Sequence, residues 1–255
     1  MFDRIQKGLW WDKPLTLVEG CTKVSPGCDN CWAESIARRF QKPDAWGTAK
    51  ERSAGLMLPH DRKKPTAWAV WNDLFHEDVS YHFIAASLLM MANCSQHIFM
   101  VLTKRAERMR DATLAFGGVP NIWLGVTAEN QEQADKRIPI LLQTSAAVRF
   151  VSIEPILGPV SFRWAMWHNY FPEGWRERKE VQGHLDGMEG ISWVILGAES
   201  GPNARSMELD WARSVRDQCR EAGVPLFIKQ LRVRGQLVKD INLFPDDLRV
   251  RELPI

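Results

Sequence analysis

The sequence lacks the apolar segments that would carry it into or across a membrane. No run approaches the roughly 20 uncharged apolar residues that a membrane-spanning helix needs. The opening stretch "MFDRIQKGLWWDKP" has no apolar region of the length found in signal peptides. We therefore expect a soluble, cytoplasmic protein with no membrane partner.

The chain also has little excess charge, with 33 Lys and Arg against 31 Asp and Glu and a formal net charge of +2. A protein that binds nucleic acid through many phosphate contacts usually carries a marked basic excess. Net charge therefore gives no support to a nucleic-acid partner, although it does not exclude one. Tyrosine is scarce as well, with two residues against twelve Trp, and we expect most indoles in the core or in pocket walls.

What is present suffices for a folded domain. The 255 residues, of which 45% are hydrophobic, can bury a substantial core. This excludes a disordered or fibrous chain, and no internal repeat indicates a solenoid. We expect a single domain over residues 1–255.

Three of the five cysteines lie within eleven residues, in "GCTKVSPGCDNC", where Cys21, Cys28 and Cys31 have the spacing CxxxxxxCxxC. In a reducing cytosol such a cluster favours metal binding or catalysis over a disulfide. A structural zinc site normally has four ligands, and no second CxxC exists, so His76 is the candidate for the fourth. Three thiolates also suit a 4Fe-4S cluster with one open iron, which the pattern favours. Zinc and unligated thiols stay as alternatives.

Short apolar runs rich in β-branched and aromatic residues alternate with helix-like segments along the chain. The runs cover residues 15–20, 67–71, 97–103, 122–127, 148–153, 192–197 and 225–230. Alternating strands and helices predict a parallel sheet with helices covering it. Six to seven such units predict an α/β fold, a partial or near-complete TIM-like βα barrel.

Each predicted strand runs into charged or amide side chains, as in "LTKR", "GVTAEN", "SIEP" and "GAESG". In βα barrels the catalytic groups lie at this carboxyl-terminal rim, so we expect these side chains to converge. The alternative is that they form turns and ion pairs within the barrel. Lys104 with Glu129 or Glu154, and Arg205 with Glu199, are examples.

An insertion at about 163–190 interrupts the alternation of strands and helices. It carries three Trp and two His residues. A segment of this length beside the rim is either a lid over the site or a surface elaboration.

The motifs taken together resemble a known family. They are "GCTKVSPGCDNCWAE", "NDLFHEDV", "LTKRAERM", "WLGVTAENQEQADKRIPIL", "RFVSIEPILGPV", "WVILGAESGPNARSM" and "FIKQ". Their order and spacing resemble the phage-associated three-cysteine-motif family, which is similar to radical S-adenosylmethionine (radical SAM) enzymes of the spore photoproduct lyase branch. The resemblance spans nearly the whole chain and implies a radical SAM type of barrel.

The resemblance implies that Cys21, Cys28 and Cys31 hold a 4Fe-4S cluster whose open iron binds S-adenosylmethionine. One electron would then cleave this cofactor to a 5′-deoxyadenosyl radical. Two departures stand out. The usual first gap between cysteines is three residues rather than six, and Asn30 replaces the aromatic residue before the third cysteine, with Trp32 following it.

The resemblance also assigns the polar strand ends to the cofactor. Asp73 and His76 would meet its methionine end, and Lys104 its carboxylate. Thr127, Glu129 and Asn130 would contact the ribose hydroxyls. Further cofactor contacts would come from Glu154, Glu199 and Ser200, and Lys229 and Gln230 would close the ring.

The resemblance further implies a substrate and partners. The substrate would be a modified or damaged, thymine-like nucleobase in DNA, flipped out of the duplex and stacked on Trp side chains of the insertion. An electron donor would be required, and the protein would be phage-encoded and act in the host cytoplasm. The alternative is a zinc- or cluster-stabilised nucleic-acid-binding or scaffold module without radical catalysis.

Overall fold

The structure, a computed structural model, describes residues 1–39, 46–163 and 188–254. Its centre is an eight-stranded sheet with the order β1-β4-β5-β6-β7-β8-β9-β10. All neighbours pair in parallel except β10, which runs antiparallel to β9. The strands are β1 (Lys13–Thr16), β4 (Ala67–Trp71), β5 (Ile98–Thr103), β6 (Ile122–Thr127), β7 (Val148–Ile153), β8 (Trp193–Gly197), β9 (Leu226–Val233) and β10 (Gln236–Val238).

The parallel strands confirm the predicted α/β class. They coincide with the seven apolar runs, apart from the first run, which breaks in two. After β1 the chain turns away from the main sheet, and β2 (Val18–Glu19) pairs antiparallel with β3 (Lys50–Glu51). The described pairings do not join the two ends of the sheet, so closure into a barrel stays a prediction.

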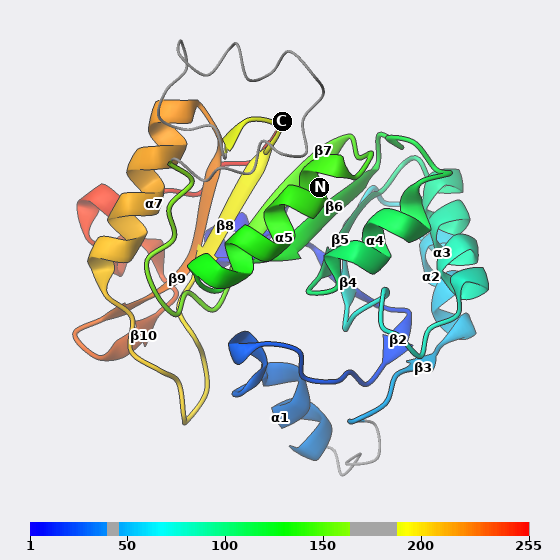
Figure 1. Ribbon diagram of the computed structural model, residues 1–255, viewed down its shortest axis with the longest axis horizontal. Helices are drawn as coiled ribbons and strands as arrows, with labels where there is room; N and C mark the ends of the chain where they lie inside the picture. Colours follow the sequence, from blue (N-terminus) through cyan, green and yellow to red (C-terminus); the bar gives the residue numbers. More distant parts are fainter. Residues whose placement is uncertain (40–45, 164–187, 255) are drawn as a thin grey trace.

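The longer helices pack on one face of the sheet, each after one of its strands, whereas α1 (Trp32–Arg39) lies beyond the carboxyl ends of the strands (Figure 1). The α-helices are α1 (Trp32–Arg39), α2 (Leu58–Asp61), α3 (Tyr81–Asn93), α4 (Ala106–Thr113), α5 (Gln131–Gln143) and α7 (Leu209–Ala222). Short 3-10 helices occupy η1 (Ile5–Lys7), η2 (Pro26–Cys28), η4 (Ser53–Leu56), η8 (Ile241–Leu243) and η9 (Asp246–Leu248). Within these ranges, no helix combines the length and apolar character needed to cross a bilayer.

The two faces of the sheet bury two separate apolar clusters, because successive side chains of a strand point to opposite faces. In β8, Val194 and Leu196 join the larger cluster that the helices cover, whereas Trp193 and Ile195 join the smaller one. Trp193 is fully buried in this inner cluster. Its ring lies 6.0 to 6.1 Å from the rings of Trp10, Trp123, Phe150 and Phe227.

The segment before β1 closes the inner face, since Phe2 and Trp10 are buried in the inner cluster. The expectation that indoles fill the core is therefore confirmed for Trp10, Trp68, Trp123 and Trp193. Aromatic rings fill this face along the strands, so the open space lies at the carboxyl ends, where α1 and the segment before it lie (Figure 1).

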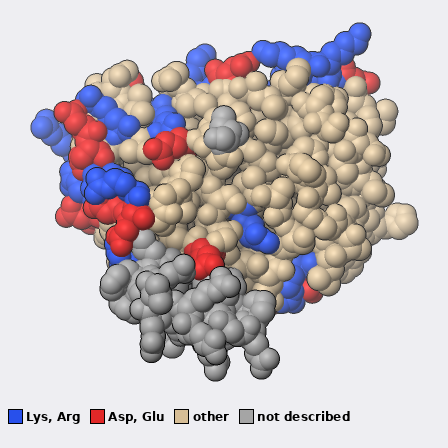
Figure 2. All heavy atoms as spheres, turned by 90° about the horizontal axis from the view of Figure 1, so that it is seen from above, with Lys and Arg blue, Asp and Glu red and all other residues tan. Residues whose placement is uncertain are grey.

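Charged side chains of both signs lie next to one another along the margins of the face shown in Figure 2, and much of its middle carries neither sign. The described residues of this face therefore form no broad patch of one sign. The distribution agrees with the small net charge of +2.

Candidate active site

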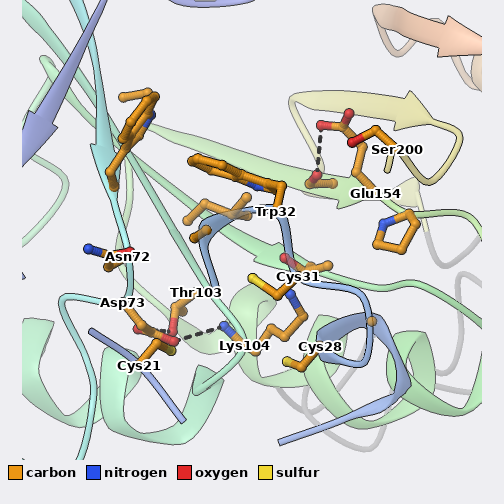
Figure 3. A pocket seen from close by; sticks show the side chains of 18 of the residues that line it. Cys21, Cys28, Cys31, Trp32, Asn72, Asp73, Thr103, Lys104, Glu154 and Ser200 are labelled. Carbon is orange, nitrogen blue, oxygen red and sulfur yellow. Dashed lines mark hydrogen bonds between the residues drawn. The ribbon is translucent and has the colours of Figure 1, made fainter. Parts of the chain in front are cut away.

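A cavity of about 440 Å³ opens at the carboxyl ends of the parallel strands, and all three clustered cysteines line it (Figure 3). Nine of the twelve side chains that the sequence and the resemblance predicted for the site line this cavity. These are Cys21, Cys28, Cys31, Asp73, Lys104, Thr127, Glu154, Glu199 and Ser200. Lys229 and Gln230 also line it, whereas His76, Glu129 and Asn130 do not.

The three cysteines belong to one segment, residues 21–31, which we call the cysteine loop. Cys28 is buried in the 3-10 helix η2, and Cys21 and Cys31 are partly exposed. In Figure 3 the side chain of Lys104 is drawn between Cys21 on one side and Cys28 and Cys31 on the other. The three thiols of the cysteine loop and the ammonium group of Lys104 therefore line the same cavity.

A single metal ion needs its protein ligands close together. Within residues 1–39, 46–163 and 188–254, no three Cys, His, Asp or Glu side chains lie close enough together to hold a single metal ion. The remaining cysteines, Cys94 and Cys219, are buried and lie outside the cavity.

His76 is engaged within the protein rather than in the cavity. Its Nδ1 atom accepts a hydrogen bond of 3.1 Å from the backbone N–H of Asp78, so Nε2 carries the proton and donates to Thr22 Oγ1 at 2.8 Å. Burial, aided by the charge of Arg105, lowers the pKa of His76 and keeps the ring neutral. Neither nitrogen of this His76 is free to be a fourth zinc ligand.

Asp73 lines the cavity at the end of β4 and is held rigidly by neighbouring donors. Its carboxylate accepts from Thr103 Oγ1 at 2.6 Å, from the backbone N–H of Phe75 at 3.0 Å and from Arg105 Nη1 at 2.9 Å. Arg105 immediately follows Lys104 and is only 8% exposed. The predicted Asp73 therefore lies at the site with a cationic partner that the sequence interpretation did not include.

Glu129 holds the cysteine loop instead of facing the cavity. Its carboxylate pairs with Arg137 Nη1 at 2.9 Å, and it accepts hydrogen bonds from Ser25 Oγ and from the backbone N–H of Gly27. The side chain is fully buried. Asn130 likewise serves the fold, because its side chain accepts from the Gln133 N–H and caps α5. Of the three residues predicted for the ribose, Thr127 alone lines the cavity.

Glu199 and Arg205 form a second attachment of the cysteine loop. Arg205 donates to Glu199 through its backbone N–H, Nε and Nη2 at 2.7, 3.0 and 2.6 Å. Arg205 Nη2 also donates to the Pro26 carbonyl at 2.8 Å, and Asn30 Nδ2 donates to Glu199 at 3.1 Å. The predicted ion pair of Arg205 with Glu199 is therefore confirmed, and it joins the end of β8 to the loop.

Glu154 closes the far side of the cavity, where Lys229 Nζ lies 3.1 Å from its Oε1 atom. Gly197 makes room for this carboxylate, since a Cβ at that position would lie 2.5 Å from Oε1. The predicted pairing of Lys104 with either glutamate is not among the ion pairs that the described residues form. Glu129 pairs with Arg137 and Glu154 with Lys229.

Aromatic side chains make the opposite wall. Trp71 at the end of β4 packs edge-to-face against Trp11 and Trp32, with ring centroids 5.8 and 4.9 Å apart. These three indoles line the cavity together with Trp46, and Trp32 is 45% exposed at its mouth. The predicted stacking surface and lid of residues 163–190 lie outside the described residues except at their ends, 163 and 188–190.

The thiol of Cys21 differs from a free thiol in its acidity. Burial, followed by the negative charge of Asp73, raises the pKa of Cys21 to about 11 from its ordinary value of 9.0. The nearby Arg105 acts in the opposite direction. The protein without a bound metal therefore keeps this thiol protonated at neutral pH.

The sequence interpretation missed Arg105, Thr22 and Ser25, and it did not assign Trp71 to the cavity. Arg105 could have been found in "LTKR", because both Lys104 and Arg105 follow the predicted strand and either side chain can face the rim. Thr22 and Ser25 lie between the cysteines and could have been expected to anchor a long loop. Nothing in the sequence alone pairs Ser25 with Glu129.

A family model described as "Protein of unknown function (DUF5131)" matches residues 6–240 of the chain. Comparisons with curated proteins and with solved structures found no match. The family match extends over the cysteine loop and all the parallel strands.

Proposed function

Because this chain belongs to the DUF5131 family of proteins of unknown function, its activity has to be inferred from its site, and we propose that it is a radical SAM enzyme. The parallel sheet would be the partial βα barrel of that class. The single observation that carries the proposal is the convergence of three thiols with polar strand ends on one cavity. A cofactor of the size of S-adenosylmethionine needs such a concave, largely preformed site.

The ligand set suits an iron-sulfur cluster better than a structural zinc ion. Cys21, Cys28 and Cys31 provide three thiolates, and no other Cys or His of the described chain lines the cavity. Three ligands leave one iron of a 4Fe-4S cluster open, whereas structural zinc normally takes four protein ligands. One electron supplied through such a cluster would cleave S-adenosylmethionine to the 5′-deoxyadenosyl radical, which abstracts hydrogen from a substrate carbon.

The chain's own residues would hold and shield the cofactor. Lys104 supplies a cation for a carboxylate, and Asp73 an anion for an ammonium group, on the side of the cavity next to the thiols. Thr127, Glu199 and Ser200 provide oxygens able to accept from hydroxyl groups. The aromatic wall of Trp11, Trp32 and Trp71 limits the access of water to this space.

As substrate we propose a modified or damaged, thymine-like base in DNA. Trp32 is partly exposed at the mouth of the cavity and offers a planar face, and bases stack on such faces once they leave the duplex. An external one-electron donor is then a necessary partner. The wall of Trp11, Trp32 and Trp71 would take the stacking role that the sequence alone assigned to the insertion.

Anaerobic reconstitution with iron and sulfide tests the chemistry. Wild-type protein should bind about four irons and four acid-labile sulfides per chain, and should release 5′-deoxyadenosine when reduced with S-adenosylmethionine. Cys21→Ala, Cys28→Ala and Cys31→Ala should abolish both results. Cys94→Ala and Cys219→Ala, at buried cysteines outside the cavity, should preserve them. One bound zinc without labile sulfide would instead establish a zinc-stabilised module.

The substrate is tested with the reconstituted protein and short DNA duplexes. Duplexes that contain thymine, or a damaged thymine, should increase the release of 5′-deoxyadenosine over the rate without DNA. Duplexes of guanine and cytosine alone should not. Equal rates with all duplexes would reject a thymine-like substrate and leave the cofactor chemistry standing.

A further inference from the structure

Arg105 occupies a central position behind the cysteine loop. Its Nη1 atom lies 3.8 Å from Cys21 Sγ and donates to Asp73 at 2.9 Å. Its Nη2 donates to Thr22 Oγ1 at 2.7 Å, and its Nε to both carboxylate oxygens of Glu77 at 2.8 and 2.7 Å. One guanidinium therefore fixes the first cysteine, the residue after it and two carboxylates from the loop that follows β4.

The first half of the cysteine loop depends on this contact. The segment from Ser25 to Asn30 is attached through Glu129, Glu199 and Arg205. The first cysteine lies outside that segment, and six residues separate it from Cys28. Thr22 Oγ1 accepts hydrogen bonds from Arg105 and from His76 at 2.7 and 2.8 Å. Cys21 and Thr22 are therefore held by these two side chains rather than by Glu129, Glu199 and Arg205.

We infer that Arg105 is a positioning residue that holds Cys21 and Thr22 in place before any metal centre binds. A long gap between the first two cysteines would otherwise leave Cys21 free to move, at an entropic cost on binding. A guanidinium is suited to this role because its donors point in fixed directions, whereas a lysine ammonium is a single point of charge. Lys104, next in the chain, cannot replace it because its side chain points into the cavity between the thiols.

A second consequence rests on the proposed function. A cationic hydrogen-bond donor beside a ligating sulfur stabilises the more negative, reduced form of an iron-sulfur cluster. The Nη1 atom of Arg105 is placed to donate to the Cys21 sulfur, and Glu77 and Asp73 keep the guanidinium in that orientation. Arg105 would therefore raise the reduction potential of a cluster bound through Cys21.

The test for loop positioning uses the full chain without any cluster, so it does not depend on the proposed chemistry. Arg105→Lys keeps the positive charge and removes the several hydrogen-bond donors that the guanidinium holds in fixed directions. Thr22→Val removes only the hydroxyl that accepts from Arg105 and His76. A hydrogen bond to a charged group is worth enough to change local opening about tenfold. We expect both variants to exchange the backbone amide of Gly47, which donates to the Cys21 carbonyl at 3.1 Å, about tenfold faster than wild type, with no change in the core strands.

Arg149→Lys is the matched control. Arg149 is a partly buried arginine that donates to the Thr144 carbonyl at 2.9 Å, near the amino end of β7 and away from the loop. This variant should exchange the Gly47 amide at the wild-type rate. Unchanged exchange in both Arg105→Lys and Thr22→Val would overturn the positioning role, whatever the cluster experiments show.

The reconstituted proteins test the second consequence by redox titration followed through the cluster's electron paramagnetic resonance signal. Arg105→Lys should lower the midpoint potential and broaden the signal. Thr22→Val leaves the Arg105 donor beside the Cys21 sulfur, so it should broaden the signal without lowering the potential, and Arg149→Lys should do neither. An unchanged potential in Arg105→Lys together with faster exchange would reject the electronic role and retain the positioning role. Failure of wild type to bind iron and sulfide would reject the proposed function, while the exchange results would still decide the positioning role.

Discussion

The backbone N–H of Gly27 donates a hydrogen bond of 2.9 Å to the Oε1 atom of Glu129, although 102 positions separate the two residues in the chain. The carboxylate is fully buried at the start of the segment after β6, and Gly27 lies next to Cys28 in the cysteine loop. The loop thus approaches the rim so closely that only a residue without a side chain fits at position 27.

Replacement of Gly27 by alanine tests this close approach. A Cβ at position 27 would lie 2.9 Å from both Cδ and Oε1 of Glu129, closer than such atoms pack. Because Glu129 is fixed by Arg137, the loop rather than the carboxylate has to move. We expect Gly27→Ala to lower the free energy of unfolding by about 1–3 kcal/mol in urea titrations.

Gly158→Ala is the control for the loss of glycine itself. No atom lies within 4 Å of a Cβ built at Gly158. Its unfolding free energy should stay close to that of wild type. Equal effects of the two substitutions would show that the contact between the loop and Glu129 is not tight.

The acidity of Glu129 predicts how stability depends on pH. Burial alone raises the pKa of Glu129, but the charge of Arg137 and the hydrogen bond from Ser25 outweigh it, so the pKa lies below the ordinary 4.5. The unfolded chain then binds this proton at a higher pH than the folded protein does. The stabilisation is therefore complete above pH 4.5 and is lost as the pH falls through the pKa of the folded state.

Urea titrations between about pH 3 and pH 7 measure this contribution of Glu129 to the free energy of unfolding, because carboxylates titrate in roughly this range. Glu129→Gln should be less stable than wild type at pH 7, and the difference should shrink as the pH falls. Glu132→Gln, at a side chain 63% exposed on α5, should follow the wild-type profile. A constant difference between Glu129→Gln and wild type at every pH would contradict the assignment.

The cysteine thiols of the cluster-free protein should differ in their reaction with iodoacetamide. The thiolate is the reactive form, and burial followed by the charge of Asp73 raises the pKa of Cys21 to about 11. Alkylation of Cys21 should therefore rise about tenfold per pH unit between pH 8 and 10. Peptide mapping by mass spectrometry resolves each site, and a plateau near pH 9 would show an unperturbed thiol.

Cys219 provides an internal reference in the same experiment. Burial raises the pKa of Cys219 to about 12, and the residue is only 1% exposed within α7. It should stay unmodified while the protein is folded. Its modification at the rate of Cys21 would indicate global unfolding rather than reaction at the loop.

The sequence predicted the strands and the side of the sheet that carries the site, because both follow from repeating local patterns. Apolar runs of four to eight residues mark buried strands, and polar residues after them mark the rim. Within β8, alternate side chains point to the two faces of the sheet, and Trp193 and Ile195 both belong to the inner cluster. Nine of the predicted site residues therefore line one cavity.

The sequence could not distinguish rim residues that face the cavity from those that hold the loop. Glu129 and Glu154 both follow a parallel strand, yet Glu129 is buried against Ser25 and Gly27 while Glu154 lines the cavity. Lys104 and Arg105 are adjacent, and only the fold shows that the guanidinium meets Cys21. Such choices depend on contacts between residues far apart in the chain, which no local pattern encodes.

Arg205 and Arg213 each pair with a carboxylate, one at a buried position and the other at an exposed one. Arg205 pairs with Glu199, a carboxylate only 5% exposed, and also reaches the Pro26 carbonyl of the cysteine loop. Arg213 pairs with Asp247 at 2.9 Å, but both side chains are well exposed, at 38% and 43%. Removal of a partner is costly where the remaining charge is buried, and nearly neutral where water replaces the partner.

We therefore expect Arg205→Gln to lower the free energy of unfolding by about 2 kcal/mol. This is less than the roughly 3–5 kcal/mol of a fully buried pair, because Arg205 itself is partly solvated. Arg213→Gln should leave the urea midpoint unchanged. Since Arg205 also anchors Pro26, its loss should speed amide exchange between Gly27 and Cys31, whereas the loss of Arg213 should not. Similar destabilisation by the two substitutions would mean that Glu199 is solvated, and that the end of β8 does not hold the cysteine loop.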